Sequence, residues 1–363
     1  MTISSTVIPG QAAKIGIKGE TTFGTLLDSD GTDTQAYRQL PMVQAPKPTF
    51  NILRESRLLS GRGSVKNAAD TITVLQNGTV TCPFDFIATP NLLLQHLAMV
   101  TNTYNADGSD IYTVEVDGSN NSTSIGGTIS SGIPHTVNLA YTPASSQGIT
   151  VPGCTVSDLT ISGDYTTNGG SLNMSGNYFS GFANTFSSSG TGTLHEVNHT
   201  GTWVYPDANV FINMGSLSTK QFEVDGNDQD MILKSFSLTI SNGVSVLGGN
   251  GKGGAEFYSF PEYTVTGSLT FKHDGEFSLG AGANVLQTFL DGNTCTLSLK
   301  FGDGTVSSVG ELNLDAECQF TGDPTQDISE QGLFWTVPFE CVQNTTTEAL
   351  KISMFSDEAI AAM

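Results

Sequence analysis

The chain has 363 residues with 41 glycines, and its wealth of Thr, Ser and Gly with few helical patterns predicts a mainly β protein of two domains. Its 35 acidic and 14 basic residues give a net charge of −21; residues 1–72 hold 8 of the basic and 6 of the acidic ones, so the remainder carries −23 and should repel nucleic acid and anionic lipid. No apolar run approaches the ~20 residues of a membrane span, and the first residues show no signal-peptide pattern.

Residues 1–48 lack sustained periodicity, although apolar residues such as Ile15, Ile17 and Met42 are scattered through them. The segment is too apolar for a pure linker and too irregular for a domain. We therefore expect an N-terminal arm that becomes ordered against a neighbouring subunit.

Residues 49–182 are predicted to form a first β module. A strand over 79–86 is followed by an apolar helix that starts at Asn91, and a hairpin turns at residues 168–170. The Gly/Ser/Thr-rich residues 118–150 are expected to be an inserted loop. Four basic residues fall between two strand patterns: Arg54, Arg57, Arg62 and Lys66.

Residues 183–200 read as a linker, and residues 201–343 as a second β module. Its strand over 263–272 has apolar residues on one face and Thr, Ser and Lys272 on the other. A second short helix is expected from Asn284 through residue 290. Residues 344–363 are expected to form a C-terminal arm or a short helix.

The two predicted modules share a strand–helix pattern. Residues 79–86 match residues 264–271, and an Asn-started apolar helix follows each segment. Residues 49–52 likewise match 235–238, residues 159–164 match 318–323, and residues 172–174 match 333–335. The positions expected to fill equivalent places in the two cores are Val80, Phe84 and Phe86 in the first and Val265, Leu269 and Phe271 in the second. With only two copies and a long period, the pattern indicates a duplicated domain rather than a solenoid.

The five cysteines form an odd set without a CxxC pair. Cys82, Cys318 and Cys341 fall in phase with apolar neighbours, as small buried hydrophobic residues do. We therefore expect free thiols from a reduced compartment and no framework of disulfide bonds.

Two motifs could indicate metal chemistry. Residues 195–199 match H-E-x-x-H, whose zinc-binding form needs a helix, but the surrounding Gly and β-branched residues favour a strand equally. Acidic turns at residues 28–33 and 225–230 lack the EF-hand spacing, and turns favour Asp and Gly in any case. No catalytic nucleophile pattern is present, so we expect no enzyme activity, no metal site and no cofactor.

Five segments carry a family resemblance: residues 19–25, 50–66, 151–164, 172–181 and 237–243. Together they resemble the tail tube proteins of long-tailed, non-contractile bacteriophages, and the larger double-module members most. The resemblance implies two tandem β-barrel or sandwich modules, each with one short helix. It also implies subunits that form rings, which stack into a hollow tube for DNA.

The resemblance further implies a structural virion protein in the phage tail, assembled in the host bacterial cytoplasm. Rings would be trimeric pseudo-hexamers or hexamers, and other partners would be the tape measure, terminator and distal tail proteins. Viral DNA would pass an acidic lumen without specific binding, since each phosphate contact would hold it back. Arg54, Arg57, Arg62 and Lys66 would contact an acidic face of the next ring. The alternatives are a capsid decoration or baseplate protein, or a carbohydrate-binding β-sandwich or adhesin.

Overall fold

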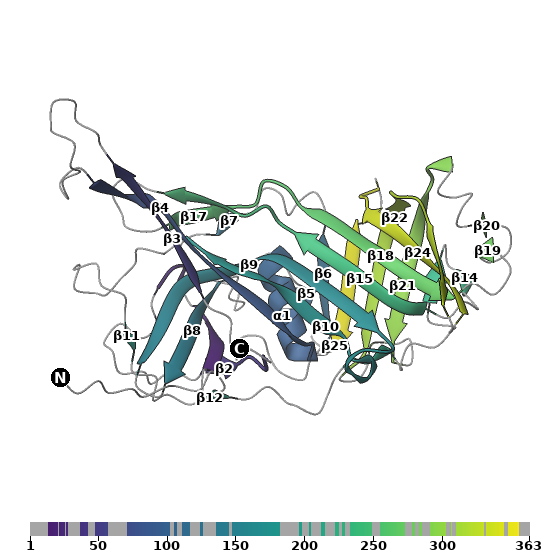
Figure 1. Ribbon diagram of the computed structural model, residues 1–363, viewed down its shortest axis with the longest axis horizontal. Coiled ribbons are helices and arrows are strands. Elements are labelled where there is room, and N and C mark those ends of the chain that lie inside the picture. The colour runs from purple at the N-terminus through teal and green to yellow at the C-terminus, as the bar shows by residue number, and fades with distance from the viewer. Residues whose placement is uncertain are drawn as a thin grey trace.

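The computed structural model describes about three fifths of the chain. These residues are 14–20, 22–25, 27, 37–42, 48–56, 71–101, 105–106, 111–116, 124–125, 136–144, 147–181, 196–197, 203–204, 212–214, 222–224, 227–228, 233–248, 255–272, 278–279, 283–284, 291–302, 306, 310–329, 332–344 and 348–355. Strands dominate them, and Figure 1 shows an elongated molecule with one long twisted sheet. The prediction of a mainly β protein is confirmed.

A single run of antiparallel strands makes the main sheet. In hydrogen-bonded order they are β3 (Thr49–Ser56), β4 (Thr71–Ile87), β10 (Asn173–Ser180), β9 (Gln147–Asp164), β15 (Leu233–Ser241), β18 (Thr264–Lys272), β24 (Gly332–Cys341), β22 (Leu312–Phe320) and β21 (Thr294–Phe301). Their residues alternate between two faces, as in β15, where Phe236, Leu238 and Ile240 are buried. One face of the sheet is therefore apolar and the other polar.

Strand β9 connects the main sheet to a second one. Its second half pairs with β10 and β15, whereas its first half pairs with β8. The other strands of the second sheet are β1 (Lys14–Gly19), β2 (Tyr37–Gln39), β8 (Val137–Ala144), β11 (Glu196–Val197) and β12 (Trp203–Val204). The described strands do not close into a barrel, so the barrel form of the expected fold is wrong.

The second sheet contains segments that were expected to be an arm and a loop. In the expected N-terminal arm, Ile15, Ile17 and Tyr37 are buried in this chain's own core, and the contact with a neighbouring subunit stays a prediction. Residues 118–150 were expected to be a loop, yet β8 lies within them with Val137 and Leu139 buried. Strands β1 and β2 are short, and polar residues interrupt β8. These features hide the alternation of apolar residues in the sequence.

Short strands extend the main sheet. They are β23 (Thr325–Ser329) beside β24, β25 (Leu350–Phe355) beside β22, β6 (Ile111–Val116) and β5 (Asn105–Ala106) beyond β25, and β13 (Phe222–Val224) and β14 (Asn227–Asp228) beyond β21. Separate small sheets hold β7 (Ser124–Ile125), β16 (Ser245–Gly248) and β17 (Ala255–Ser259), and β19 (Ser278–Leu279) with β20 (Ala283–Asn284).

Two helices expected in the C-terminal part of the chain differ from expectation. A C-terminal helix is wrong for residues 350–355, because Leu350, Ile352 and Met354 alternate with period two and fill the core from β25. The expected start of the second helix, Asn284, belongs to strand β20. The rest of that expected helix, residues 285–290, lies outside the described residues.

The predicted first helix is confirmed as α1 (Pro90–Thr101). It starts at Pro90 rather than Asn91, since proline at the first helical position loses no hydrogen bond. Every residue of α1 is buried, and the helix packs against β9, β6 and β25 below the main sheet in Figure 1. Within the described part of the chain, no helix has the length and hydrophobicity to cross a bilayer.

The predicted hairpin between β9 and β10 is also confirmed. Its turn is the 3-10 segment η4 (Asn168–Gly170), where Asn168, Gly169 and Gly170 have φ values of 49°, 65° and 81°. These left-handed conformations favour Gly and Asn over other residues, which explains the local sequence.

One continuous hydrophobic core spans both predicted modules. The six positions expected to be equivalent all lie in it with exposed fractions of 2–5%: Val80, Phe84, Phe86, Val265, Leu269 and Phe271. The strands that hold the matching segments follow the same order in the two predicted modules. The order is β3-β4-β10-β9 in the first module, and it is followed directly by β15-β18-β24-β22 in the second. The duplication and the domain boundaries stay predictions, since a shared order does not establish superposition.

Candidate functional site

The most extensive functional candidate is the outward side of the four central strands, which we call the polar face. Cross-strand register places fifteen side chains on it. They are Asp158, Thr160, Ser162 and Asp164 of β9, Asn173, Ser175 and Asn177 of β10, Ser235, Ser237, Thr239 and Ser241 of β15, and Thr264, Thr266, Ser268 and Thr270 of β18. All are exposed or half-buried, so the polar face is a broad surface of short side chains.

Cross-strand hydrogen bonds hold many of these side chains in place. The Thr160 and Thr239 hydroxyl oxygens lie 2.8 Å apart, and the Asn177 amide donates to both oxygens of Asp158 at 3.0 and 3.2 Å. Bonds of this kind between facing residues stabilise a sheet and fix its side-chain positions. The polar face is therefore smooth and ordered, with few groups free to reach outward.

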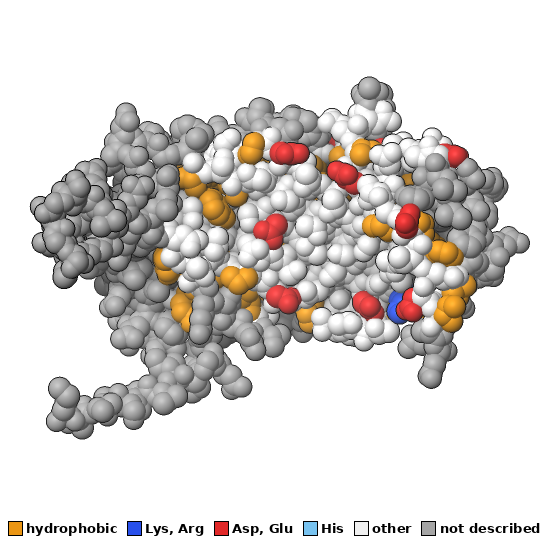
Figure 2. Space-filling model, turned by 45° about the horizontal axis from the view of Figure 1, so that its top comes forward, with side chains coloured by type: hydrophobic (Ala, Val, Ile, Leu, Met, Phe, Trp, Pro, Cys, Tyr) orange, Lys and Arg blue, Asp and Glu red, His pale blue; other side chains and the backbone are white. Residues whose placement is uncertain are grey.

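The centre of the polar face carries negative charge, and lysines occur at one end of it: Lys272 follows Thr270 on this side of β18, opposite Phe334, and the Lys234 Nζ lies 4.5 Å from the centre of the Phe334 ring. Among its fifteen residues, Asp158 and Asp164 are charged and none is Lys or Arg. Asp85 on β4 and Glu340 on β24 continue the same side of the sheet at its flanks. Figure 2 shows a face of the molecule on which Asp and Glu side chains are scattered over a largely uncharged polar surface. Away from the end that holds Lys272 and Lys234, such a surface offers a phosphate no cation to bind.

The structure places one of the four predicted inter-ring residues. The Arg54 backbone lies in β3 opposite Thr73, and Arg57, Arg62 and Lys66 lie outside the described residues. Because β3 is the end strand of the run of paired strands, Arg54 is at an edge of the main sheet. The inter-ring contact stays a prediction.

The possible metal motifs gain no geometric support in the described regions. Glu196 and Val197 of the H-E-x-x-H match are extended in β11, opposite Ile149 and Gly148, whereas the zinc-binding form needs a helix. Of the two acidic turns, Asp228 lies in β14 and the other aspartates lie outside the described residues. No group of three or more His, Cys, Asp or Glu side chains is placed to hold a metal ion among the residues described.

A buried carboxylate that sequence reasoning did not identify as a site ties the N-terminal segment to the second sheet. Glu20 Oε1 accepts hydrogen bonds from the Gly153 amide and the Asn138 side chain, both at 2.6 Å. Its Oε2 accepts from the Thr136 hydroxyl at 2.7 Å and from the Gly24 amide at 2.9 Å. Burial raises the pKa of Glu20 to about 7, and the hydrogen bonds from Gly153, Thr136 and Gly24 oppose that rise.

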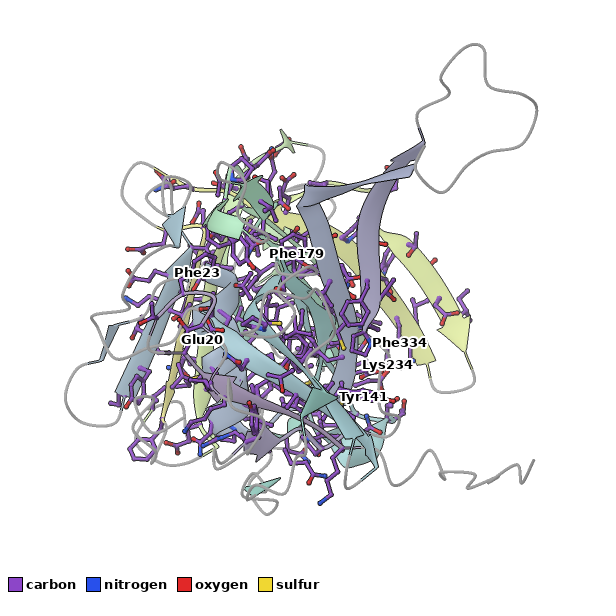
Figure 3. The ribbon with its side chains drawn as sticks, turned by 90° about the vertical axis from the view of Figure 1, so that its left-hand side faces the viewer. Glu20, Phe23, Tyr141, Phe179, Lys234 and Phe334 are labelled. Carbon is purple, nitrogen blue, oxygen red and sulfur yellow. The ribbon has the colours of Figure 1, made fainter. Side chains whose placement is uncertain are left out.

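Aromatic contacts enclose the neighbourhood of this carboxylate. Phe23 packs edge-on against Tyr258 with ring centroids 4.9 Å apart, and the Tyr258 hydroxyl donates to the Gly153 carbonyl at 2.5 Å. Figure 3 shows Glu20 and Phe23 near each other on the same side of the molecule. The Gly-Glu-Thr-Thr-Phe-Gly run is the local signal and includes Gly24, but the other three partners of Glu20 lie more than 100 residues away.

A second titratable group is buried beneath the main sheet. His96 on α1 hydrogen-bonds the Leu92 carbonyl through Nδ1 at 2.6 Å and the Tyr178 hydroxyl through Nε2 at 2.5 Å. Since Nδ1 must donate to the carbonyl, neutral His96 accepts from Tyr178. Burial lowers the pKa of His96 to about 4, so it stays neutral near pH 7 and acts in packing.

Comparison with known proteins identifies the family. The model of the phage tail tube protein family matches residues 10–341, which confirms the resemblance seen in the sequence. No curated protein matches the chain. Members of the family are structural components that assemble a tail tube with other tail proteins in the virion. The chain belongs to the phage tail tube protein family.

Proposed function

We propose that the chain assembles into stacked rings that form the hollow phage tail tube, and that its polar face lines the bore through which DNA passes. The observation that carries this proposal is the polar face itself: fifteen short side chains with two carboxylates and no cation among them, bounded by Lys272 at one end of β18. The role is structural and requires no catalytic residue.

The chemistry of the polar face suits a conduit. Each phosphate bound by Lys or Arg adds affinity through counterion release, and many such contacts would stop a moving strand. Hydroxyl groups such as those of Thr160 and Thr239 are occupied by each other, and Asp158 is held by Asn177. The lumen is thus mostly neutral and hydroxylated, with sparse carboxylates that repel the backbone of DNA.

The strand order favours a ring of three chains. Two sets of four strands lie side by side in the main sheet: β3, β4, β10 and β9, and then β15, β18, β24 and β22. The predicted repeat positions fall on the second strand of each set, β4 and β18. If each set occupies one sixth of the ring, three chains give a pseudo-hexamer with cyclic symmetry. The tape measure, terminator and distal tail proteins would then contact the tube inside or at its ends, after assembly in the host cytoplasm.

The basic residues Arg54, Arg57, Arg62 and Lys66 are proposed to contact an acidic face of the next ring. Exposed charge pairs weaken with salt, so tube length should fall as ionic strength rises. We expect an Arg57→Glu/Arg62→Glu variant to form rings that do not stack. Tubes of normal length from this variant, seen by negative-stain microscopy, would rule out the contact.

The bore assignment is tested by adding cations to the polar face. Thr264 and Thr266 are exposed on it, and a Thr264→Arg/Thr266→Arg variant should assemble normally but release DNA more slowly, with the defect relieved by salt. Thr22 and Thr25 are exposed outside the polar face, so Thr22→Arg/Thr25→Arg is the matched control. Equal DNA release rates from intact particles of both variants would contradict the proposal.

A further inference from the structure

In the run of paired strands from β3 to β21, the narrowest joint lies between β22 and β24. These strands share only three register pairs, whereas β18 and β24 share seven and β21 and β22 share eight. The β21–β22–β25 portion is therefore attached to the rest of the main sheet through a short stretch of ladder. A covalent bond at this point would have a large effect on how the two portions move relative to each other.

Two cysteines face each other at this joint. Cys318 and Cys341 are register partners, and their Sγ atoms lie 4.0 Å apart. The Val342 amide donates to the Glu317 carbonyl, which makes Cys318 and Cys341 a non-hydrogen-bonded pair. In such pairs the Cα atoms are about 4.5 Å apart, within the range that a disulfide bond spans. Rotation of the side chains can therefore close the bond without moving the strands.

We propose that Cys318 and Cys341 are a redox-active pair that forms a disulfide bond across the β22–β24 joint when a low-molecular-weight disulfide is present. Cys295 lies opposite Cys318 on β21. The register favours Cys341 as the partner of Cys318, because these two form a non-hydrogen-bonded pair, in which side chains approach more closely. All three residues are buried as thiols in the structure. Cys341 is the most exposed of them, at 8%, against 2% for Cys295 and 0% for Cys318.

The exposed fractions of Cys341 and Cys318 set the order of the two thiol–disulfide exchange steps. The Cys341 thiolate attacks one sulfur of the small disulfide and releases the first small thiol. The Cys318 thiolate then attacks the Cys341 sulfur and releases the second. Both protein thiols are oxidised, the small disulfide is reduced to two thiols, and the two protons lost by the protein end on those thiols. The hydrogen bond with Cys341 and burial raise the pKa of Cys318, so the second step should accelerate with rising pH.

The test incubates the folded, unassembled subunit with glutathione disulfide and maps its peptides by mass spectrometry without reduction. We expect a linked pair of peptides containing Cys318 and Cys341, a mass loss of about 2 Da for the two hydrogens, and complete reversal by dithiothreitol. A Cys295→Ser variant should give the same linkage, and Cys318→Ser and Cys341→Ser variants should lose it.

Hydrogen exchange provides a second readout on the wild-type protein alone. The Val342 and Thr321 amides close the joint by donating to Glu317 and Pro338, and both should exchange more slowly after oxidation. A linkage of Cys295 to Cys318 would overturn the proposal. So would thiols that remain free in the folded subunit while the urea-unfolded chain oxidises in the same buffer. Because no tube is involved, either result would leave the tail tube proposal standing.

Discussion

Replacement of Glu20 by Gln should change how the stability of the subunit depends on pH. Glu20 is buried, and its folded-state pKa is raised from 4.5 to about 7. The folded protein therefore binds the Glu20 proton more tightly than the unfolded chain does. The stabilisation from this proton is present in full below pH 4.5 and is lost as the pH rises towards 7. A shift of this size corresponds to about 3 kcal/mol.

The assay is urea unfolding of the wild type and Glu20→Gln at several pH values from 4.5 to 7.5. Relative to the variant, the wild type should lose about 3 kcal/mol of unfolding free energy across this range, because Gln keeps the shape but does not titrate. His96 titrates in the opposite sense: its pKa is lowered to about 4, so stability falls as the pH drops from 6.5 towards 4. Both proteins retain His96, and its contribution cancels in the difference.

Glu115→Gln is the control for removal of a carboxylate, because Glu115 is 39% exposed beside Lys351 and an exposed ion pair contributes little to stability. A flat difference for Glu20→Gln would refute the reasoning. A difference that instead favours the wild type as pH rises would mean that the four donors around Glu20 outweigh its burial and hold its pKa below 4.5.

Two other perturbations test the core and the sheet. Tyr178→Phe leaves His96 Nε2 buried without its donor and should cost about 1–3 kcal/mol in urea unfolding, whereas no loss would mean that the bond contributes nothing. Gly176→Ala would place a methyl group against the Asp158 carbonyl oxygen and should abolish soluble folded protein. Gly169→Ala is the matched change, because no atom lies within 4 Å of the added Cβ and only the φ of 65° disfavours alanine. This variant should lose about 1 kcal/mol of unfolding free energy. Soluble, stable Gly176→Ala protein would contradict the β9–β10 register.

The sequence predicted the strands whose apolar positions alternate without interruption. Val265, Leu269 and Phe271 are an example, since period-two alternation is a local property that burial of one face imposes directly. Helix α1 was also predictable from local sequence, because its apolar residues follow one another within a single short segment. The short strand β2 was missed, since three residues are too few to display a period.

The alternation of apolar residues could not predict the register between paired strands. Ile161 pairs with Met174, but its predicted equivalent Phe320 pairs with Phe339 instead of Trp335, four residues away. A shift of four residues keeps every side chain on its original face, so alternation alone cannot distinguish the two registers. Loop lengths and distant packing decide between them.

The polar face was only partly predictable. Thr264, Thr266 and Thr270 could be assigned to an outward face from their own strand, but their neighbours in β9 and β15 come from residues far along the chain. The donors around Glu20 have the same origin. A buried carboxylate with four partners cannot be distinguished in sequence from a solvated one, because the burial depends on segments more than 100 residues away.

Electron cryomicroscopy of assembled particles tests the central claim most directly. The account predicts a hollow tube of stacked rings in which the side chains of Thr160, Thr239 and Thr266 point into the bore. A tube with these residues on its outer surface, or a bore lined by lysine and arginine, would contradict it.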